Sequence, residues 1–258
     1  MNASAMQTAV YPSLRGKRVV VTGGGSGIGA SIVAAFARQG AQVSFLDIAV
    51  EESRALERSL PKSATAPRFY DCDLRDLKAV RSTFSEISER TGTPQILINN
   101  AGNDDRHAFE SVTPEYWDDR LSVNLRHLFF CSQAVTPAMR AARSGVIINL
   151  GSVSWHLALS NLTAYQTAKA GIEGLTRALA RELGEHGIRV ACIVPGGVRT
   201  PRQTRLWHTP EEEARILAQQ CLKIRVEPED VAALALFLAS DDARACTAHE
   251  YFVDAGWR

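Results

Sequence analysis

Three side chains near the middle of the sequence have the types and spacing needed to move a proton. Tyr165 and Lys169 lie four residues apart in a segment, 163–185, whose apolar residues recur at helical spacing, so both are expected on one helix face. A phenol has an ordinary pKa of about 10, and a nearby ammonium favours its ionised form. Ser152 follows an apolar run, 146–150, that predicts a buried strand ending where open α/β sheets bind ligands. Alone, a Tyr–Lys pair at this spacing is more often part of a solvent-facing helix without a catalytic role, so it needs independent support.

That support comes from a glycine-rich turn near the start of the chain. A β-branched run at 17–22 leads into TGGGSGIG at 22–29, and a helical pattern follows at 30–39. A strand, a glycine turn and a helix in this order favour a dinucleotide, because the N–H groups and dipole at the helix N-terminus stabilise a pyrophosphate.

The next predicted strand, 42–46, ends at Asp47. A carboxylate at this position can accept hydrogen bonds from the adenosine ribose and would repel a 2′-phosphate. We therefore expect NAD rather than NADP, although Asp47 also fits a cap for the predicted helix 50–59. Asp73 has two similar interpretations, an adenine contact or a cap for the helix that follows.

Strands and helices alternate along the rest of the chain, which predicts an α/β fold with a single doubly wound parallel sheet and helices on both faces (Rossmann-type). The further strands are expected at 67–70, 95–98, 145–150, 189–194 and 250–253, and the further helices at 77–91, 115–139, 163–185, 210–221 and 228–239. We expect one catalytic domain, 1–258, with an N-terminal extension at 1–15 and a substrate loop region at 196–221. The least regular part is 198–206.

The composition excludes several classes of protein. The chain has 258 residues, 45% of them hydrophobic and 22% charged, and a formal net charge of +1, which does not favour nucleic acid or a membrane surface as a partner. Five cysteines without a CxxC pair argue against a disulfide framework or a zinc site, so no metal is expected. We find no signal-peptide pattern or long apolar stretch, and expect a cytoplasmic protein.

Taken together, the motifs resemble the short-chain dehydrogenase/reductase family over nearly the whole chain. Six signals match in order: the glycine turn 22–29, Asp73, the run Asn99-Asn100-Ala101-Gly102, Asn124, Ser152 with Tyr165 and Lys169, and Pro195-Gly196. Gln166 and Thr167, between the tyrosine and the lysine, are less usual for the family.

The resemblance implies roles for these positions. Tyr165 would be the general base or acid, Lys169 would lower its pKa and hold the nicotinamide ribose, Ser152 would orient the reacting oxygen, and Asn124 would hold a water in a proton relay. The implied NAD-binding residues are Gly23, Ser26, Gly27, Ile28, Gly29, Asp47, Asp73, Leu74, Asn100, Ala101, Gly102, Tyr165, Lys169, Pro195, Gly196, Val198 and Thr200. The family is commonly tetrameric, so a homotetramer is expected.

Segments outside the shared core, 103–107, 154–157 and 248–258, are similar to bacterial NAD-dependent sugar 1-dehydrogenases of this family. The candidate substrate residues are Asn103, Asp104, Arg106, Ser154, Trp155, His156, Arg202 and Trp207, with His107 in the same stretch as Arg106. A polar set with two tryptophans suits a polyol. Asp104, Arg106 and His107 also fit a surface salt-bridge cluster, and Trp155 fits the core.

We therefore expect oxidation of an aldopyranose, D-xylose first, at C1 to the aldonolactone, with Tyr165 as the base. Two other functions stay open. One is an NAD(P)H-dependent carbonyl reductase acting on a ketose or a 3-oxoacyl substrate. The other is a non-catalytic dinucleotide-binding regulator.

Overall fold

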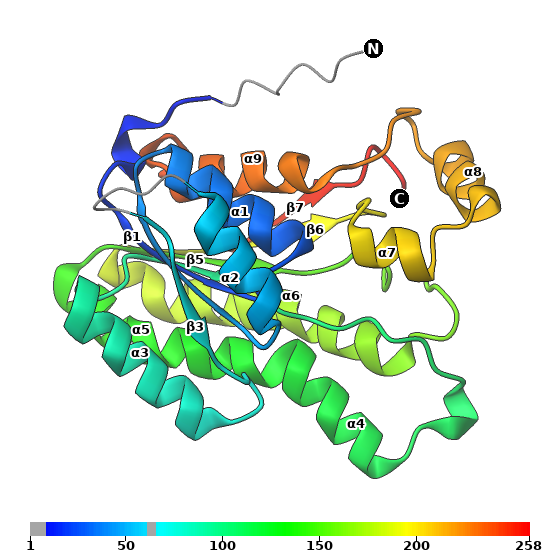
Figure 1. Cartoon of the computed structure of the whole chain (residues 1–258), viewed down its shortest axis with the longest axis horizontal. Helices are drawn as coiled ribbons and strands as arrows, with labels where there is room; N and C mark the ends of the chain where they lie inside the picture. The colour runs from blue at the N-terminus through cyan, green and yellow to red at the C-terminus, as the bar shows by residue number, and fades with distance from the viewer. Residues whose placement is uncertain (1–8, 61–65) are drawn as a thin grey trace.

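Seven parallel strands form one twisted sheet in the computed structural model, which describes residues 9–60 and 66–258 (Figure 1). The strand order is β3-β2-β1-β4-β5-β6-β7. The strands are β1 (Arg18–Thr22), β2 (Gln42–Asp47), β3 (Arg68–Asp71), β4 (Ile96–Asn99), β5 (Gly145–Leu150), β6 (Ile188–Pro195) and β7 (Glu250–Val253). The doubly wound α/β fold predicted from the sequence is confirmed.

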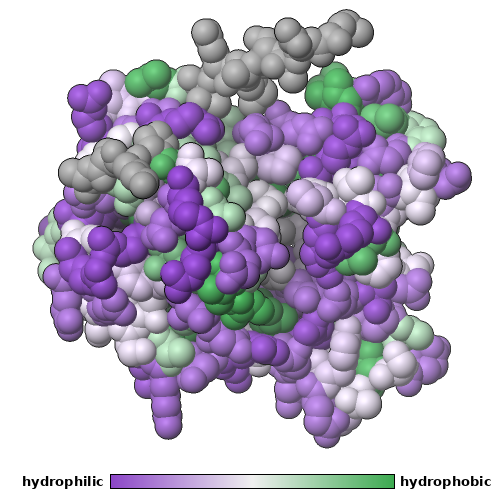
Figure 2. All heavy atoms as spheres, in the orientation of Figure 1, coloured by the Kyte–Doolittle hydropathy of each residue, from purple (hydrophilic) through white to green (hydrophobic). Residues whose placement is uncertain are grey.

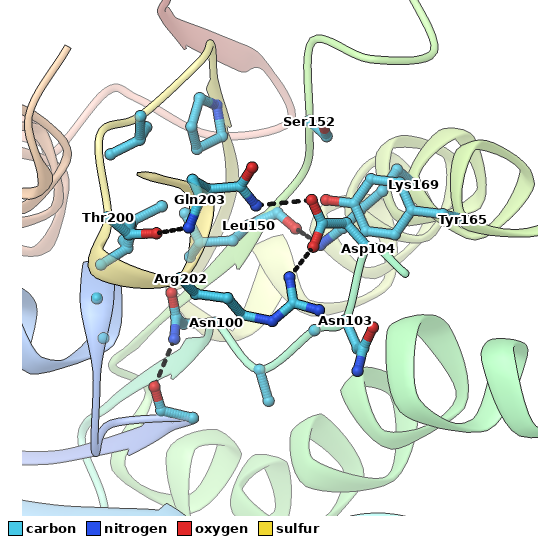
Figure 3. A pocket seen from close by; sticks show the side chains of 18 of the residues that line it. Asn100, Asn103, Asp104, Leu150, Ser152, Tyr165, Lys169, Thr200, Arg202 and Gln203 are labelled. Atoms are coloured by element: carbon cyan, nitrogen blue, oxygen red, sulfur yellow. Dashed lines mark hydrogen bonds and ion pairs between the residues drawn. The ribbon is translucent and has the colours of Figure 1, made fainter. Parts of the chain in front are cut away.

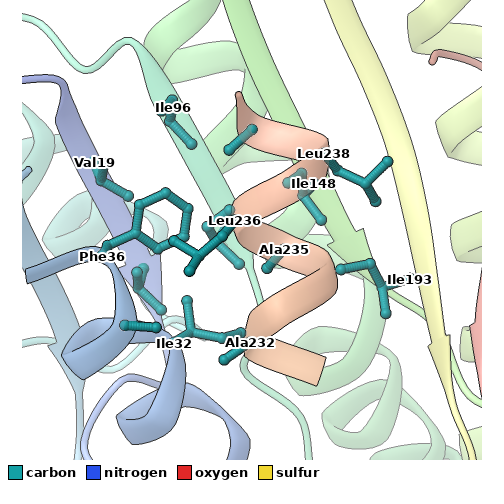
Figure 4. Close-up of a cluster of buried hydrophobic side chains, with 14 of the residues drawn as sticks. Val19, Ile32, Phe36, Ile96, Ile148, Ile193, Ala232, Ala235, Leu236 and Leu238 are labelled. Atoms are coloured by element: carbon teal, nitrogen blue, oxygen red, sulfur yellow. The ribbon is translucent and has the colours of Figure 1, made fainter. Parts of the chain in front are cut away.

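Helices cover both faces of the sheet (Figure 1). They are α1 (Gly27–Arg38), α2 (Val50–Ser59), α3 (Leu77–Thr91), α4 (Pro114–Leu121), α5 (His127–Ala142), α6 (Thr163–Leu183), α7 (Pro201–Leu206), α8 (Pro210–Gln219) and α9 (Pro228–Ala239). Helices α1 and α9 pack on one face, where Phe36 and Leu236 meet Val19 and Ile148 of the sheet (Figure 4). Helices α3, α5 and α6 cover the other face.

The order of the strands reverses between β1 and β4, and this reversal positions the site. Thr22 and Asn99, the last residues of these two strands, are paired in register. The glycine turn after β1 and the Asn100–Gly102 turn after β4 therefore leave the sheet side by side, at the kind of crevice where open α/β sheets bind ligands.

A buried polar network joins the central strands to the helices around the site. The Asn99 side chain donates to Asn149 of β5 at 2.9 Å and to Ser132 of α5 at 3.3 Å, and Asn149 donates to Thr176 of α6 at 2.9 Å. All four residues are at most 1% exposed. The network fixes the position of α6, which carries Tyr165 and Lys169.

Two helical predictions need correction. The stretch 198–206, expected to be irregular, contains α7, because Thr200 caps the Gln203 N–H and Pro201 occupies the first helical position. The helix expected at 115–139 is two helices joined by a π-helical turn, Ser122–Arg126. Such turns are frequent at functional sites.

The N-terminal extension expected at 1–15 lies partly outside the described residues. In the described part, Leu14 is fully buried in the core beneath α1 and α9, so this residue belongs to the folded body. The face in Figure 2 is mainly hydrophilic and has a hollow near its centre. Within 9–60 and 66–258, no helix is long and apolar enough to cross a membrane, and no group of His, Cys, Asp or Glu is arranged to hold a metal ion.

Candidate active site

A cleft of about 590 Å³ lies at the carboxyl ends of the strands and brings most of the expected site residues together. All seventeen expected cofactor residues line it, and so does Ser152. Of the expected substrate residues, it is lined by Asn103, Asp104, Arg106, Ser154 and Arg202. The cleft has a glycine-lined end next to α1 and a polar end next to α7. Figure 3 shows Asp104, Arg202 and Gln203 at the polar end.

The glycine-lined end is shaped by contacts that only glycine allows. A Cβ atom at Gly29 would lie 1.9 Å from the carbonyl oxygen of Gly23, and one at Gly23 would lie 2.7 Å from the Cα atom of Ala101. Helix α1 begins here, so its first N–H groups face the cleft without intrahelical acceptors. This backbone geometry suits a pyrophosphate.

Asp47 closes this end of the cleft and holds the glycine turn in place. One carboxylate oxygen accepts the N–H of Gly25 at 2.8 Å, and the other accepts those of Ile48 and Ala49 at 2.8 and 2.9 Å. The residue therefore ties the turn before α2 to the glycine turn, and it also lines the cleft. Asp47 does not cap α2, because the N–H groups it accepts belong to residues that precede the helix, whose N-cap is Ala49.

Asp73 does not cap α3, so that interpretation is wrong. The cap is Asp76, whose carboxylate accepts the N–H groups of Lys78 and Ala79. Asp73 lines the cleft and pairs with Arg75 at 2.8 Å, and the Arg75 guanidinium lowers the pKa of the Asp73 carboxyl. Asp76 sits directly before the helix, whereas Asp73 lies three residues too early to cap it.

Tyr165 and Lys169 lie on one face of α6, as the four-residue spacing predicts. The Lys169 ammonium is 5.4 Å from the centre of the Tyr165 ring and donates to the carbonyl oxygen of Leu150 at 2.8 Å (Figure 3). Ser152 follows the same strand and donates to the Ser154 hydroxyl at 2.9 Å. The end of β5 therefore supports both Ser152 and Lys169.

The electrostatics of this pair differ from the expectation. Burial raises the pKa of Tyr165, and the Asp104 carboxylate raises it further, while the Ser152 hydroxyl and the guanidiniums of Arg106 and Arg202 oppose the rise. Burial also lowers the pKa of Lys169 to about 8. The net pKa of Tyr165 therefore lies above its ordinary value, although the Lys169 ammonium is 5.4 Å from the ring centre. The cost of desolvating the phenolate outweighs the charges around it.

Asn124 lies in the π-helical turn, fully buried, beside the cleft rather than in its lining. Its side-chain oxygen accepts the N–H of Asn103 at 2.8 Å, and its nitrogen donates to the carbonyl oxygens of Asn103 and Arg120, both at 3.0 Å. A Cβ at Gly102 would lie 3.1 Å from the Asn124 oxygen and 3.4 Å from the Lys169 nitrogen. Asn124 and Lys169 therefore flank the same backbone position.

His107 caps the N-terminus of α6, a role that the sequence did not indicate. Its Nε2 accepts the N–H of Ala164 at 3.3 Å, at the start of α6, and it also contacts the Thr163 hydroxyl at 3.1 Å. On the other side of the ring, Nδ1 contacts the Tyr116 hydroxyl at 3.1 Å. His107 does not line the cleft. It joins α4, the loop after β4 and the N-terminus of α6.

The polar end of the cleft is built from two segments almost one hundred residues apart. Arg202 donates to Asp104 Oδ1 at 2.6 Å and also pairs with Asp105. Gln203, which was not predicted, donates to Asp104 Oδ2 at 2.7 Å (Figure 3). The Asp104 side chain is 19% exposed. A carboxylate, a guanidinium and an amide thus converge next to Tyr165.

Three expected substrate residues lie outside the cleft lining. The Trp155 indole donates to Glu173 at 2.9 Å, and His156 contacts the same carboxylate oxygen at 2.9 Å and packs against Phe252. Trp207 packs under Arg106, whose guanidinium carbon is 5.1 Å from the ring centre. The three residues are partly exposed but do not line the cleft, so the structure does not place them as direct substrate contacts.

A family model described as "Enoyl-(Acyl carrier protein) reductase" matches residues 23–258. "D-xylose 1-dehydrogenase" of Caulobacter vibrioides is 62% identical over 253 residues, which are 98% of this chain and 100% of that protein. "Probable galactose dehydrogenase GalD" of Rhizobium meliloti is 49% identical over 252 residues, covering 97% of this chain and 98% of that protein.

The fold has close counterparts among solved structures. A crystal structure of a protein from Sinorhizobium meliloti 1021 superposes with a TM-score of 0.90 at 33% identity. The match covers 95% of this chain and 98% of the other. The likeness therefore extends over the sheet and both helix layers.

Proposed function

Because the chain belongs to the short-chain dehydrogenase/reductase family, we propose that it oxidises an aldopyranose at C1, with D-xylose as the first substrate and NAD as the hydride acceptor. The observation that carries this proposal is the polar wall of Asp104, Arg202 and Gln203 beside Tyr165. A fatty or steroid substrate would need a mainly apolar wall. The similarity to proteins named as D-xylose and galactose dehydrogenases supports a sugar.

The glycine-lined end of the cleft fits a dinucleotide. Only glycine is compatible with the close approach at Gly23 and Gly29, and the N–H groups at the start of α1 suit the pyrophosphate. The Asp47 carboxylate supports NAD over NADP, because a 2′-phosphate beside it would meet a like charge. When bound, the oxidised nicotinamide accepts a hydride from the substrate, and its positive charge favours the Tyr165 phenolate.

In this proposal, Tyr165 accepts the proton of the anomeric hydroxyl while Ser152 orients that oxygen. Lys169 holds the nicotinamide ribose and, with a pKa of about 8, can exchange a proton near neutral pH. Asn124 and Lys169 flank Gly102, which supports a relay that returns the proton to solvent. The product is the aldonolactone.

We further propose that the chain forms a homotetramer in the cytoplasm. Phe109, Trp117 and Phe129 are 72%, 36% and 45% exposed on or beside α4 and α5. Large apolar side chains left in solvent favour a contact with a second copy. Light scattering coupled to size-exclusion chromatography measures the number of copies directly.

The test of the function is the growth of NADH absorbance with the purified protein, comparing NAD with NADP across D-xylose, L-arabinose, D-glucose and D-galactose. We expect NAD-dependent turnover on D-xylose, with the other aldoses slower. A preference for NADPH and for reduction of a 3-oxoacyl thioester or a ketose would favour the carbonyl reductase instead. Tight NADH binding without turnover on any of these substrates would favour a regulator.

A further inference from the structure

The side chain of Gln203 lies in the first turn of α7 and points into the polar end of the cleft (Figure 3). Its amide nitrogen donates to Asp104 Oδ2 at 2.7 Å, while Arg202 donates to the other oxygen of the same carboxylate at 2.6 Å. The bond to Asp104 fixes the orientation of the Gln203 amide, so its oxygen faces away from the carboxylate. This leaves a hydrogen-bond acceptor in a defined position beside the catalytic residues.

The Asp104 carboxylate retains capacity for a ligand. Each carboxylate oxygen can accept about two hydrogen bonds, and within the described residues the protein supplies one bond to each. The carboxylate is close enough to Tyr165 to raise its pKa, so a group bound to Asp104 lies near the proton acceptor. An acceptor pair of this kind suits two neighbouring hydroxyl groups, each of which can donate.

Anchoring of α7 does not account for the Gln203 side chain. The Gln203 backbone N–H is already capped by the Thr200 hydroxyl at 3.2 Å. Arg202 bridges α7 to both Asp104 and Asp105, so the helix is tied to the loop after β4 without the Gln203 amide. Loss of the amide should therefore leave the helix in place and change only the surface that the cleft presents.

We propose that Gln203 is a specificity-determining residue, which together with Asp104 recognises two adjacent ring hydroxyls of the aldose; this rests on the proposed sugar oxidation. An epimer whose hydroxyl points elsewhere leaves a partly buried carboxylate or amide without its partner. Sites built from directed hydrogen bonds reject such substrates more strongly than apolar pockets do. Arg202 acts here as a positioning residue, because it holds the Asp104 carboxylate.

The experiment compares kcat and KM of wild type, Gln203→Leu and Gln203→Glu on D-xylose, L-arabinose, D-glucose and D-galactose at saturating NAD. For Gln203→Leu we expect KM for the preferred aldose to rise by about 10- to 100-fold, with a smaller change in kcat. The ratios of kcat/KM between the sugars should move towards one, while KM for NAD stays within about twofold.

Gln203→Glu adds a second measurement, the pH dependence of KM for the aldose, which a purely structural role of Gln203 would leave unchanged. It places a second carboxylate against Asp104, and like charges raise the pKa of one member of such a pair. KM for the aldose should therefore be highest at neutral and alkaline pH and fall as the pH is lowered. Wild type and Gln203→Leu should lack this trend.

Glu89→Leu is the control, because Glu89 is exposed on α3, away from the cleft and from the apolar side chains proposed to contact a second copy. Unchanged sugar ratios in Gln203→Leu, with wild type active on aldoses, would overturn this proposal and leave the proposed function standing. Parallel changes in KM for NAD, KM for sugars and melting temperature would show a structural role and also overturn it. Wild type inactive on every aldose would overturn both proposals.

Discussion

The two ends of the cleft are built in different ways. The glycine-lined end consists of backbone: the turn after β1, the start of α1 and the close contact between Gly23 and Ala101. The polar end consists of side chains that arrive from the loop after β4 and from α7 and hold one another in place. Backbone geometry is fixed by the sheet and tolerates few changes, whereas a side-chain wall can be altered one residue at a time.

The largest effect should come from Tyr165→Phe, which removes the proposed proton acceptor and leaves both ends of the cleft in place. We expect kcat on D-xylose to fall by about 10³-fold, the scale of general acid–base catalysis. NADH binding, followed by fluorescence titration, should change little. Comparable turnover in the variant would exclude Tyr165 as the base, and a parallel loss of NADH binding would show that the two ends are not separable.

Gly29→Ala should damage the backbone-built end. The added Cβ would lie 1.9 Å from the Gly23 carbonyl oxygen, so the turn must shift. A displacement of about 1 Å can cost about 100-fold in an aligned site, and we expect a loss of that size in NADH affinity.

Gly174→Ala is the control for that substitution, since Gly174 is an exposed helical glycine and no atom of the described residues lies within 4 Å of the added Cβ. This change should raise the free energy of unfolding by about 0.5 to 1 kcal/mol and leave NADH affinity unchanged. Equal loss of affinity in both variants would mean that the close contact at Gly29 is unimportant.

Lys169 belongs to both ends, and its burial predicts a dependence of stability on pH. Its pKa is lowered to about 8 in the folded chain from 10.5, so between these values the unfolded chain binds more protons and stability rises with pH. Relative to Lys169→Met, the free energy of unfolding of the protein should rise by about 2 kcal/mol between pH 8 and 9.5. Urea unfolding of both proteins at each pH measures this difference. A constant difference would show that Lys169 keeps an ordinary pKa.

The smallest effect on catalysis should come from Trp155→Phe, because the indole bonds to Glu173 outside the cleft lining. We expect KM for D-xylose to stay within about twofold and the melting temperature to fall by roughly 2 to 4 °C, as for the loss of one hydrogen bond worth about 1 kcal/mol. A rise in KM of tenfold or more, with an unchanged melting temperature, would return Trp155 to the substrate site.

The difference between the backbone-built end and the side-chain-built end of the cleft also explains which features could be predicted from the sequence. The glycine turn, the strand ends and the four-residue spacing of Tyr165 and Lys169 are local patterns, and the structure places all of them in one cleft. The strand boundaries differ from the predicted ones by about one residue, because hydrophobic runs mark burial better than they mark the last hydrogen bond.

The substrate end could not be predicted as well, because side-chain direction in a turn depends on distant contacts. Trp155 follows Ser152 closely, yet its ring turns to Glu173 on α6. Gln203 was missed because α7 has only six residues, too few to show helical periodicity. The Tyr165 pKa was misjudged because spacing reveals the nearby ammonium but not the degree of burial.

The buried network of Asn99, Ser132, Asn149 and Thr176 has a consequence for how this chain can diverge. Replacing one member by an apolar residue leaves its partners without a hydrogen bond. Each unsatisfied buried group lowers the free energy of unfolding by about 1 to 3 kcal/mol. An all-apolar version of comparable stability would require several simultaneous substitutions, and bonded partners in this network are up to 50 residues apart in the sequence. We therefore expect these four residues to stay the same together among related chains. The side chains around Gln203 should differ between relatives that act on different substrates.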